Sequence, residues 1–186
     1  MNVVSLSGSP SVNSRAARLL HFVERRLADR AGTLHHLSLR ELPAADLLAA
    51  RADAPALRQA VAQVLEADLV LVATPIYKAA YSGLLKVFLD LLPPDALRGK
   101  WVLPMATGGS PAHQLALEYA LKPVLATLGA RHILNSVYIT DDQWRTSSVH
   151  GPVPDAEVIE RIDAAIVSLY AAPRAFRQPA AVLAAA

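Results

Sequence analysis

The run Leu69–Ala73, Leu-Val-Leu-Val-Ala, is the sequence feature that most constrains the fold. It contains no polar side chain. A short aliphatic run of this kind, rich in β-branched residues, is typical of a strand that is buried on both faces. Such strands occur in parallel sheets whose two faces are covered by helices. The run therefore predicts an α/β protein with a central parallel sheet.

The remaining sequence repeats this strand signal in alternation with helical segments. Further strands are expected at 3–6, 33–39, 101–106 and 133–139, and helices at 13–29, 55–66, 82–92, 111–128 and 155–170, with an irregular excursion at 42–53. Alternating strands and helices favour right-handed crossovers between parallel strands. We predict a three-layer α/β sandwich with a five-stranded parallel sheet of order 2-1-3-4-5 and helices on both faces. It forms a single domain over 1–172, followed by a mobile tail at 173–186 that is rich in Ala and Pro.

Composition excludes several classes of function. Apolar residues make up 53% of the chain and charged residues 18%, which is a globular composition. Because there is no cysteine, disulfides, iron–sulfur clusters and cysteine nucleophiles are excluded. The formal net charge is only +2 and no block of Lys and Arg is present, so nucleic-acid binding is not expected. The chain shows neither a signal peptide nor an apolar run of about 20 residues, which predicts a soluble, cytoplasmic protein.

A metal site is not expected either. His35 and His36 lie in a predicted strand, so their side chains point to opposite faces of the sheet and cannot share an ion. Asp141 and Asp142 follow the last predicted strand, and we interpret them as a structural turn.

Three loops are expected to meet at the carboxyl edge of the sheet, near its topological switch point, where folds of this type bind ligands. They cover 7–15, 74–81 and 107–113, and each is rich in small, hydroxyl or Gly residues. This concentration of such residues at one edge is the main functional signal that the residues give by themselves.

The first loop offers the groups that a phosphate monoester needs. Ser7, Ser9 and Ser14 supply hydroxyls, Arg15 supplies a guanidinium, and free amides are expected at the start of the following helix. The loop is neither a Walker loop nor a three-glycine dinucleotide motif, which favours a mononucleotide. The alternative is an ordinary strand-to-helix turn with an N-cap.

The second and third loops suit a flat heteroaromatic ring. Pro75, Ile76, Tyr77 and Lys78 combine apolar surface with open backbone, and Thr107-Gly108-Gly109 lets backbone approach a ligand closely. Each loop also has a simpler interpretation. The tyrosines of the second loop fit surface or interface residues, and the third loop fits an ordinary strand-to-helix turn.

A proline conflicts with the helical pattern at 111–128. In an α-helix the amide of residue 123 would donate to the Tyr119 carbonyl, but Pro123 has no such donor. The helix must kink or widen there, and a one-turn π-bulge is one way to do so. Bulges of that kind are frequent at functional sites. The alternative is a plain proline kink with Tyr119 packed between helices.

These motifs together resemble the NADPH-dependent FMN reductases that serve bacterial alkanesulfonate monooxygenases. The resemblance extends from Val3 to about Asp142. Its telling segments are 8–10 with Ser14-Arg15, 73–83, 89–93, and 106–109 continuing through 112–113 to 119–125. The stretch 143–151 and the tail depart from the pattern.

The resemblance implies a flavodoxin-like fold with FMN and NADPH (or NADH) as cofactors. It also implies a homotetramer that passes reduced flavin to an FMN-dependent monooxygenase, which releases sulfite from sulfonates. In that family a tyrosine of a π-helix lies at the tetramer interface near flavin, and Tyr119 matches it as the candidate catalytic residue.

The remaining assignments combine the loops with this resemblance. Ser9, Ser14 and Arg15 would hold the phosphate, 75–78 would line the isoalloxazine ring, and Gly108, Gly109 and the nearby His113 would lie at its polar edge. The alternatives are a quinone or azo reductase with tightly bound FMN, a flavodoxin-type electron carrier, or a scaffold without ligand. A quinone or azo reductase would have the same fold, with FMN held tightly.

Overall fold

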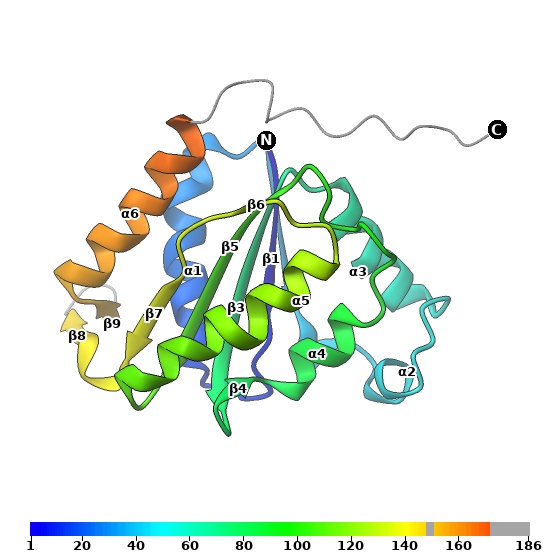
Figure 1. The fold of residues 1–186 in the computed structure, drawn as a ribbon, viewed down its shortest axis with the longest axis horizontal. Helices are drawn as coiled ribbons and strands as arrows, with labels where there is room; N and C mark the ends of the chain where they lie inside the picture. The colour runs from blue at the N-terminus through cyan, green and yellow to red at the C-terminus, as the bar shows by residue number, and fades with distance from the viewer. Residues whose placement is uncertain (148–150, 172–186) are drawn as a thin grey trace.

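A computed structural model describes residues 1–147 and 151–171 of the chain. Figure 1 shows three layers, with helices on both sides of a central sheet. The parallel strands are β1 (Asn2–Ser7), β2 (Thr33–Ser38), β3 (Leu69–Tyr77), β5 (Trp101–Gly108), β6 (His132–Ile133) and β7 (Val137–Thr140). The sheet order is β2-β1-β3-β5, and β6 and β7 both pair with the outer side of β5. The predicted order 2-1-3-4-5 is thus confirmed, with two short strands at the fifth position.

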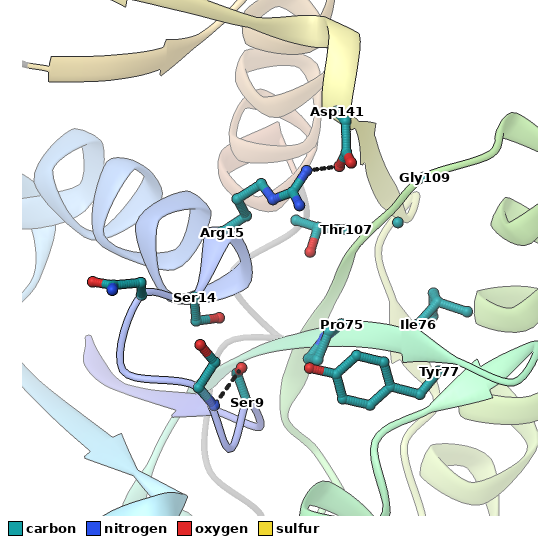
Figure 2. A pocket seen from close by; sticks show the side chains of 12 residues that line it. Ser9, Ser14, Arg15, Pro75, Ile76, Tyr77, Thr107, Gly109 and Asp141 are labelled. Atoms are coloured by element: carbon teal, nitrogen blue, oxygen red, sulfur yellow. Dashed lines mark hydrogen bonds and ion pairs between the residues drawn. The ribbon is translucent and has the colours of Figure 1, made fainter.

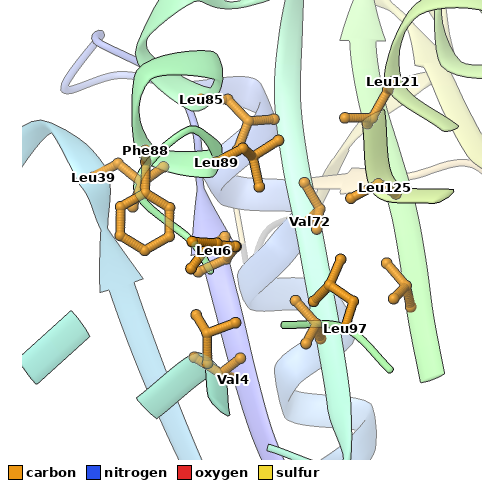
Figure 3. Close-up of a cluster of buried hydrophobic side chains, with 14 of the residues drawn as sticks. Val4, Leu6, Leu39, Val72, Leu85, Phe88, Leu89, Leu97, Leu121 and Leu125 are labelled. Carbon is orange, nitrogen blue, oxygen red and sulfur yellow. The ribbon is translucent and has the colours of Figure 1, made fainter. Parts of the chain in front are cut away.

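One face of the sheet is covered by α3 (Pro55–Glu66), α4 (Gly83–Leu89) and α5 (Lys122–Thr127). Val70 and Val72 point toward this face, because alternate residues of a strand share a face. They pack there with Phe88 and Leu85 of α4 and Leu125 of α5 (Figure 3).

The opposite face is covered by α1 (Arg15–Leu27) and α6 (Ala156–Ala171). Leu69 and Leu71 of β3 pack on this face with Leu20 of α1 and Ile162 of α6. The Leu69–Ala73 run is therefore buried on both faces, as its composition predicts. Among the described residues, no helix has the length and apolar character needed to cross a membrane.

The predicted loop at 74–81 is wrong in its first half. β3 continues through Tyr77 because β5 supplies partners as far as Pro75, which lies opposite Thr107, and β4 then pairs with Ile76 and Tyr77. β3 then turns back through Lys78 and Ala79 into β4 (Ala80–Tyr81), which pairs with it antiparallel. Both turn residues have positive φ, 49° and 61°, as a two-residue type I′ turn requires.

The helix expected at 111–128 is divided into three segments. They are a 3₁₀ segment η3 (Pro111–Gln114), a π-helical turn η4 (Leu117–Leu121) and α5. The strand expected at 133–139 is likewise interrupted between β6 and β7.

Several smaller elements complete the chain. They are η1 (Ala28–Arg30), η2 (Leu39–Glu41), α2 (Ala44–Leu48) within the expected excursion, η5 (Asp141–Gln143), and an unpredicted hairpin of β8 (Trp144–Ser147) and β9 (Gly151–Pro154). The expected tail at 173–186 lies outside the described residues.

Candidate functional site

A cavity of about 270 Å³ opens at the carboxyl edge of the sheet, where the first loop, the end of β3 and the end of β5 meet (Figure 2). Predicted site residues make up most of its wall. The cavity is lined by Ser9, Ser11, Asn13, Ser14, Arg15, Pro75, Ile76, Tyr77, Thr107, Gly108, Gly109 and Asp141.

The hydroxyls of the first loop are held by the loop's own backbone. Ser14 is the N-cap of α1, and its Oγ accepts a hydrogen bond from the Ala17 amide at 3.1 Å. The Oγ of Ser9 accepts one from the Ser11 amide at 3.2 Å. Because both oxygens act as acceptors in these bonds, both hydroxyl protons can be donated to an anion. The N-terminus of α1 adds amides and the positive end of a helix dipole, so this end of the cavity suits a phosphate.

Arg15 forms an ion pair with Asp141 across the cavity (Figure 2). The two side chains are 47% and 51% exposed. An ion pair at this exposure is worth only about 0–1 kcal/mol, so the guanidinium can be redirected to an incoming anion at little cost. The sequence interpretation of Asp141 as a purely structural turn missed this contact.

Gly8 fixes the first loop to the sheet. Its amide donates to the Ala73 carbonyl at 2.8 Å, and its own carbonyl accepts a hydrogen bond from the Ser82 hydroxyl. A Cβ at this position would lie 2.9 Å from the Cβ of Leu85, closer than such atoms approach. Glycine is therefore required here for packing against α4.

The other end of the cavity is apolar and aromatic. Pro75, Ile76 and Tyr77 form the end of β3, and the Tyr77 ring points back toward Pro75 and the first loop (Figure 2). The Thr74 hydroxyl accepts a hydrogen bond from the Ser82 amide and donates one to the Pro75 carbonyl, both at 3.0 Å. Tyr77 is 48% exposed, so this end of the site is open. Apolar surface beside open backbone suits a planar heteroaromatic ring.

The two glycines of the third loop differ in their surroundings. A Cβ on Gly108 would overlap the Tyr138 hydroxyl, which donates to the Ser110 carbonyl at 2.7 Å. Burial raises the pKa of Tyr138, so its hydroxyl stays protonated as a donor. A Cβ on Gly109 would meet no atom within 4 Å. Gly108 is thus constrained by packing, whereas Gly109 is open.

Four predicted site residues do not line the cavity. Ser7 is buried at the end of β1, Lys78 lies in the β3–β4 turn, and His113 lies in η3. Tyr119 lies in η4 and is 80% exposed.

Ser11 and Asn13 line the cavity but were not singled out from the sequence. Both lie inside the predicted loop, so their position there was the available signal.

The predicted conflict at Pro123 is resolved by a π-turn. In η4 the Lys122 amide bonds to the Leu117 carbonyl, a π-type spacing, in the turn that precedes Pro123. Glu118 secures this turn, since it accepts hydrogen bonds from Lys122 at 2.7 Å and Ser136 at 2.9 Å. Burial raises the pKa of Glu118, but these two hydrogen bonds outweigh it, and the pKa lies below its usual value.

The fold and the cavity define a class of protein, an α/β sandwich with a cavity suited to a mononucleotide phosphate at the switch point of its sheet. A solved flavodoxin from Streptococcus pneumoniae has the same fold, with a TM-score of 0.60 at 17% identity over 91% of this chain and 96% of that one. The family model for NADPH-dependent FMN reductases matches residues 1–145. The chain belongs to this family of oxidoreductases, which use FMN and NAD(P)H, and the predicted family, fold and cofactors are confirmed.

Individual relatives agree with this assignment. An FMN reductase (NADPH) from Escherichia coli K12 is 45% identical over 92% of this chain and 90% of its own length. An NADH-dependent FMN reductase, SfnE, from Pseudomonas putida is 35% identical over 97% of this chain and 98% of its own length. The apo structure of an NADH:FMN oxidoreductase, EMOB, has a TM-score of 0.81 at 39% identity, over 96% of this chain and 95% of that one.

Proposed function

We propose that this protein transfers a hydride from NADPH to FMN and releases the reduced flavin to a separate FMN-dependent monooxygenase that obtains sulfur from sulfonates. The observation that carries the proposal is the donor set of Ser9, Ser14 and Arg15 at the N-terminus of α1. These groups match a terminal phosphate monoester, which FMN has and riboflavin lacks.

The residues of the cavity divide the work of holding FMN between its two ends. Ser9, Ser14 and Arg15 hold the phosphate, whereas Pro75 and Tyr77 offer apolar surface to the ring. FMN supplies the hydride-accepting chemistry, so the protein contributes position and electrostatics.

Release of reduced flavin is supported by the exposure of the ring end. Tyr77 is half exposed, and the wall beside it is the end of a two-stranded hairpin. A flavin that is anchored chiefly through its phosphate can dissociate intact. Reduced flavin must dissociate in this way if a second enzyme is to use it.

The proposed assembly is a cytoplasmic homotetramer that associates through the surface around η4. Leu115 and Tyr119 lie one helical turn apart and are 58% and 80% exposed. We infer from these two exposed apolar side chains that this surface becomes buried in the assembly. Tyr119 would then act on flavin exchange through this interface.

The test is steady-state oxidation of NADPH and NADH with FMN, FAD or riboflavin as acceptor. The proposal expects turnover with FMN to exceed turnover with riboflavin at equal, subsaturating flavin. It is overturned if added FMN supports no NAD(P)H oxidation. Coupling to an alkanesulfonate monooxygenase then tests the partner, since sulfite must appear only when both proteins are present.

Two further results would redirect the assignment within the same fold. Protein that stays yellow through gel filtration indicates tightly bound FMN and a quinone or azo reductase. A stable one-electron semiquinone on titration indicates an electron carrier.

A further inference from the structure

A second cluster of titratable side chains lies between α1 and the edge strand β2. Glu24 of α1 is buried, and its two carboxylate oxygens are approached by two different histidines. The Nδ1 of His21 lies 2.7 Å from Oε2, and the Nδ1 of His36 lies 2.7 Å from Oε1. The two imidazole rings stack, with centroids 4.5 Å apart and planes inclined by 25°.

We propose that His21, Glu24 and His36 form a zinc site that joins α1 to β2. One ligand atom from each residue lies within 4.8 Å of the other two. Tetrahedral zinc with ligands at about 2.0–2.2 Å places those atoms roughly 3.3 Å apart. The two histidine–carboxylate contacts, which go to different oxygens of Glu24, need to open by about half an ångström, and any pair of ligand atoms separated by as much as 4.8 Å needs to close toward roughly 3.3 Å, for the ion to be held.

The chemistry of the three ligands favours zinc over harder cations. Two imidazole nitrogens and one carboxylate oxygen form a common zinc set, whereas Mg²⁺ and Ca²⁺ prefer oxygen ligands alone. The Glu24 carboxylate would bind in its ionised form, and each histidine through its Nδ1 in the unprotonated state.

The surroundings provide access and a supporting hydrogen bond. The side chains of His21 and His36 are 50% and 27% exposed, so an ion can enter and a water can fill a fourth position. Both histidines line a surface pocket of about 250 Å³ that adjoins the cavity described above, since Ser11 lines both. The buried Ser5 hydroxyl donates to Oε1 of Glu24 and orients the carboxylate from within the sheet.

The sequence does not reveal this cluster because the partners of His36 lie on another element. The adjacent His35 lies on the opposite face of β2 and cannot share a ligand with His36. The actual partners of His36 come from α1, where His21 and Glu24 are three residues apart and share a face.

The site can be tested without flavin. Tag-free, chelator-treated full-length protein is titrated with Zn²⁺ in competition with a chromogenic zinc indicator. We expect one zinc ion per chain, with affinity at least about tenfold weaker in His21→Ala, His36→Ala and Glu24→Gln. His35→Ala is the matched control, because it removes a histidine of the same strand and should leave the affinity unchanged.

Two further measurements separate a built site from surface binding. Co²⁺ should give the visible absorption bands of tetrahedral coordination in the wild type and not in His21→Ala. Zinc should also raise the melting temperature of the wild type, since it binds the folded chain. The proposal is overturned if the folded wild type binds no stoichiometric zinc, or if His35→Ala weakens binding as much as His36→Ala does. If Glu24→Gln fails to fold, the half-exposed His21 carries the test.

Discussion

The two ends of the cavity proposed to hold FMN are built in different ways. The first loop is fixed by Gly8 to β3 and α4, and its hydroxyls lie on the capped N-terminus of a long helix. The opposite end consists of the buried Pro75 and Ile76 of β3 and the half-exposed Tyr77, next to a two-residue hairpin turn in left-handed conformation. Both ends rest on the core, but only the second end continues into an exposed hairpin.

Because of this difference, one end of the cavity would set the affinity for flavin and the other would set how readily flavin leaves. Polar groups that the fold has already positioned bind a phosphate without further ordering, so the first loop can supply most of the binding energy. The open end adds apolar contact that is lost easily when the flavin leaves. The proposed function, in which the protein binds oxidised flavin and releases it reduced, would benefit from this division. Variants at the phosphate end should therefore change the affinity for flavin, whereas variants at the ring end should change the rate of flavin exchange.

The largest expected effect is at the phosphate end. Arg15→Ala should weaken FMN binding by roughly 10- to 100-fold, because a hydrogen bond to a charged group contributes about 1.5–3 kcal/mol. Riboflavin binding should not change, since riboflavin has no phosphate. Equilibrium titration of flavin fluorescence measures both affinities.

Arg18→Ala is the matched control for Arg15→Ala. Arg18 is an exposed arginine of the same helix and lies outside the cavity wall. Equal loss of FMN affinity in the two variants would show that only the general positive charge of α1 matters. If Arg15→Ala weakens the binding of FMN and of riboflavin equally, the phosphate of FMN does not bind at this loop.

The next effect concerns the third loop. Gly108→Ala should lower the free energy of unfolding by about 2 kcal/mol, because the added Cβ overlaps the Tyr138 hydroxyl. Gly109→Ala, whose Cβ meets no atom within 4 Å, should unfold like the wild type apart from small backbone effects. Urea unfolding measures both values.

A double-mutant cycle isolates the cause of the Gly108 effect. Tyr138→Phe alone should cost about 1 kcal/mol through the lost hydrogen bond to Ser110. In that background Gly108→Ala should cost much less, since the nearest remaining ring atom would be 3.4 Å away. Additive costs would show that the loop backbone, and not the hydroxyl, requires glycine.

The sheet and the phosphate end could be predicted from sequence because their signals are local. Leu69–Ala73 needs only its own composition to indicate a buried strand, and a strand followed by Ser9, Ser14 and Arg15 indicates an anion site wherever the helix begins. Pro123 is likewise a local signal, because the lost donor is a property of the residue itself.

The ring end could not be predicted to the same degree because partners from elsewhere decide it. Pro75 normally ends a strand, but β3 continues past it because Ile76 and Tyr77 pair with β4, after β5 has paired with β3 as far as Pro75. Lys78-Ala79 has neither the Gly nor the Asn that marks a type I′ turn, so the hairpin has no sequence signature. Asp141 reaches Arg15 only through the sheet order, which places η5 beside the start of α1.

A smaller effect tests the ion pair that joins the two sides of the cavity. Asp141→Asn should strengthen FMN binding several-fold, because it removes a negative charge that competes for Arg15 and repels the phosphate, a contribution of about 1 kcal/mol at this exposure. The gain should shrink as salt is added, since salt screens exposed charges. Weaker binding in Asp141→Asn would instead mean that the carboxylate positions the guanidinium for the phosphate.

The smallest effect is at the hairpin turn. Ala79 has a φ of 61°, a region that costs an alanine about 1 kcal/mol and costs glycine nothing. Ala79→Gly removes this cost but loses about 0.4–1 kcal/mol of entropy on folding, so the free energy of unfolding should rise by only a few tenths of a kcal/mol, roughly 0.3. Ala80→Gly, one residue later in β4 and without positive φ, is the control and should lower stability instead. If both variants are destabilised equally, the left-handed turn carries no strain, and the contrast between a fixed phosphate end and a strained ring end fails at this position.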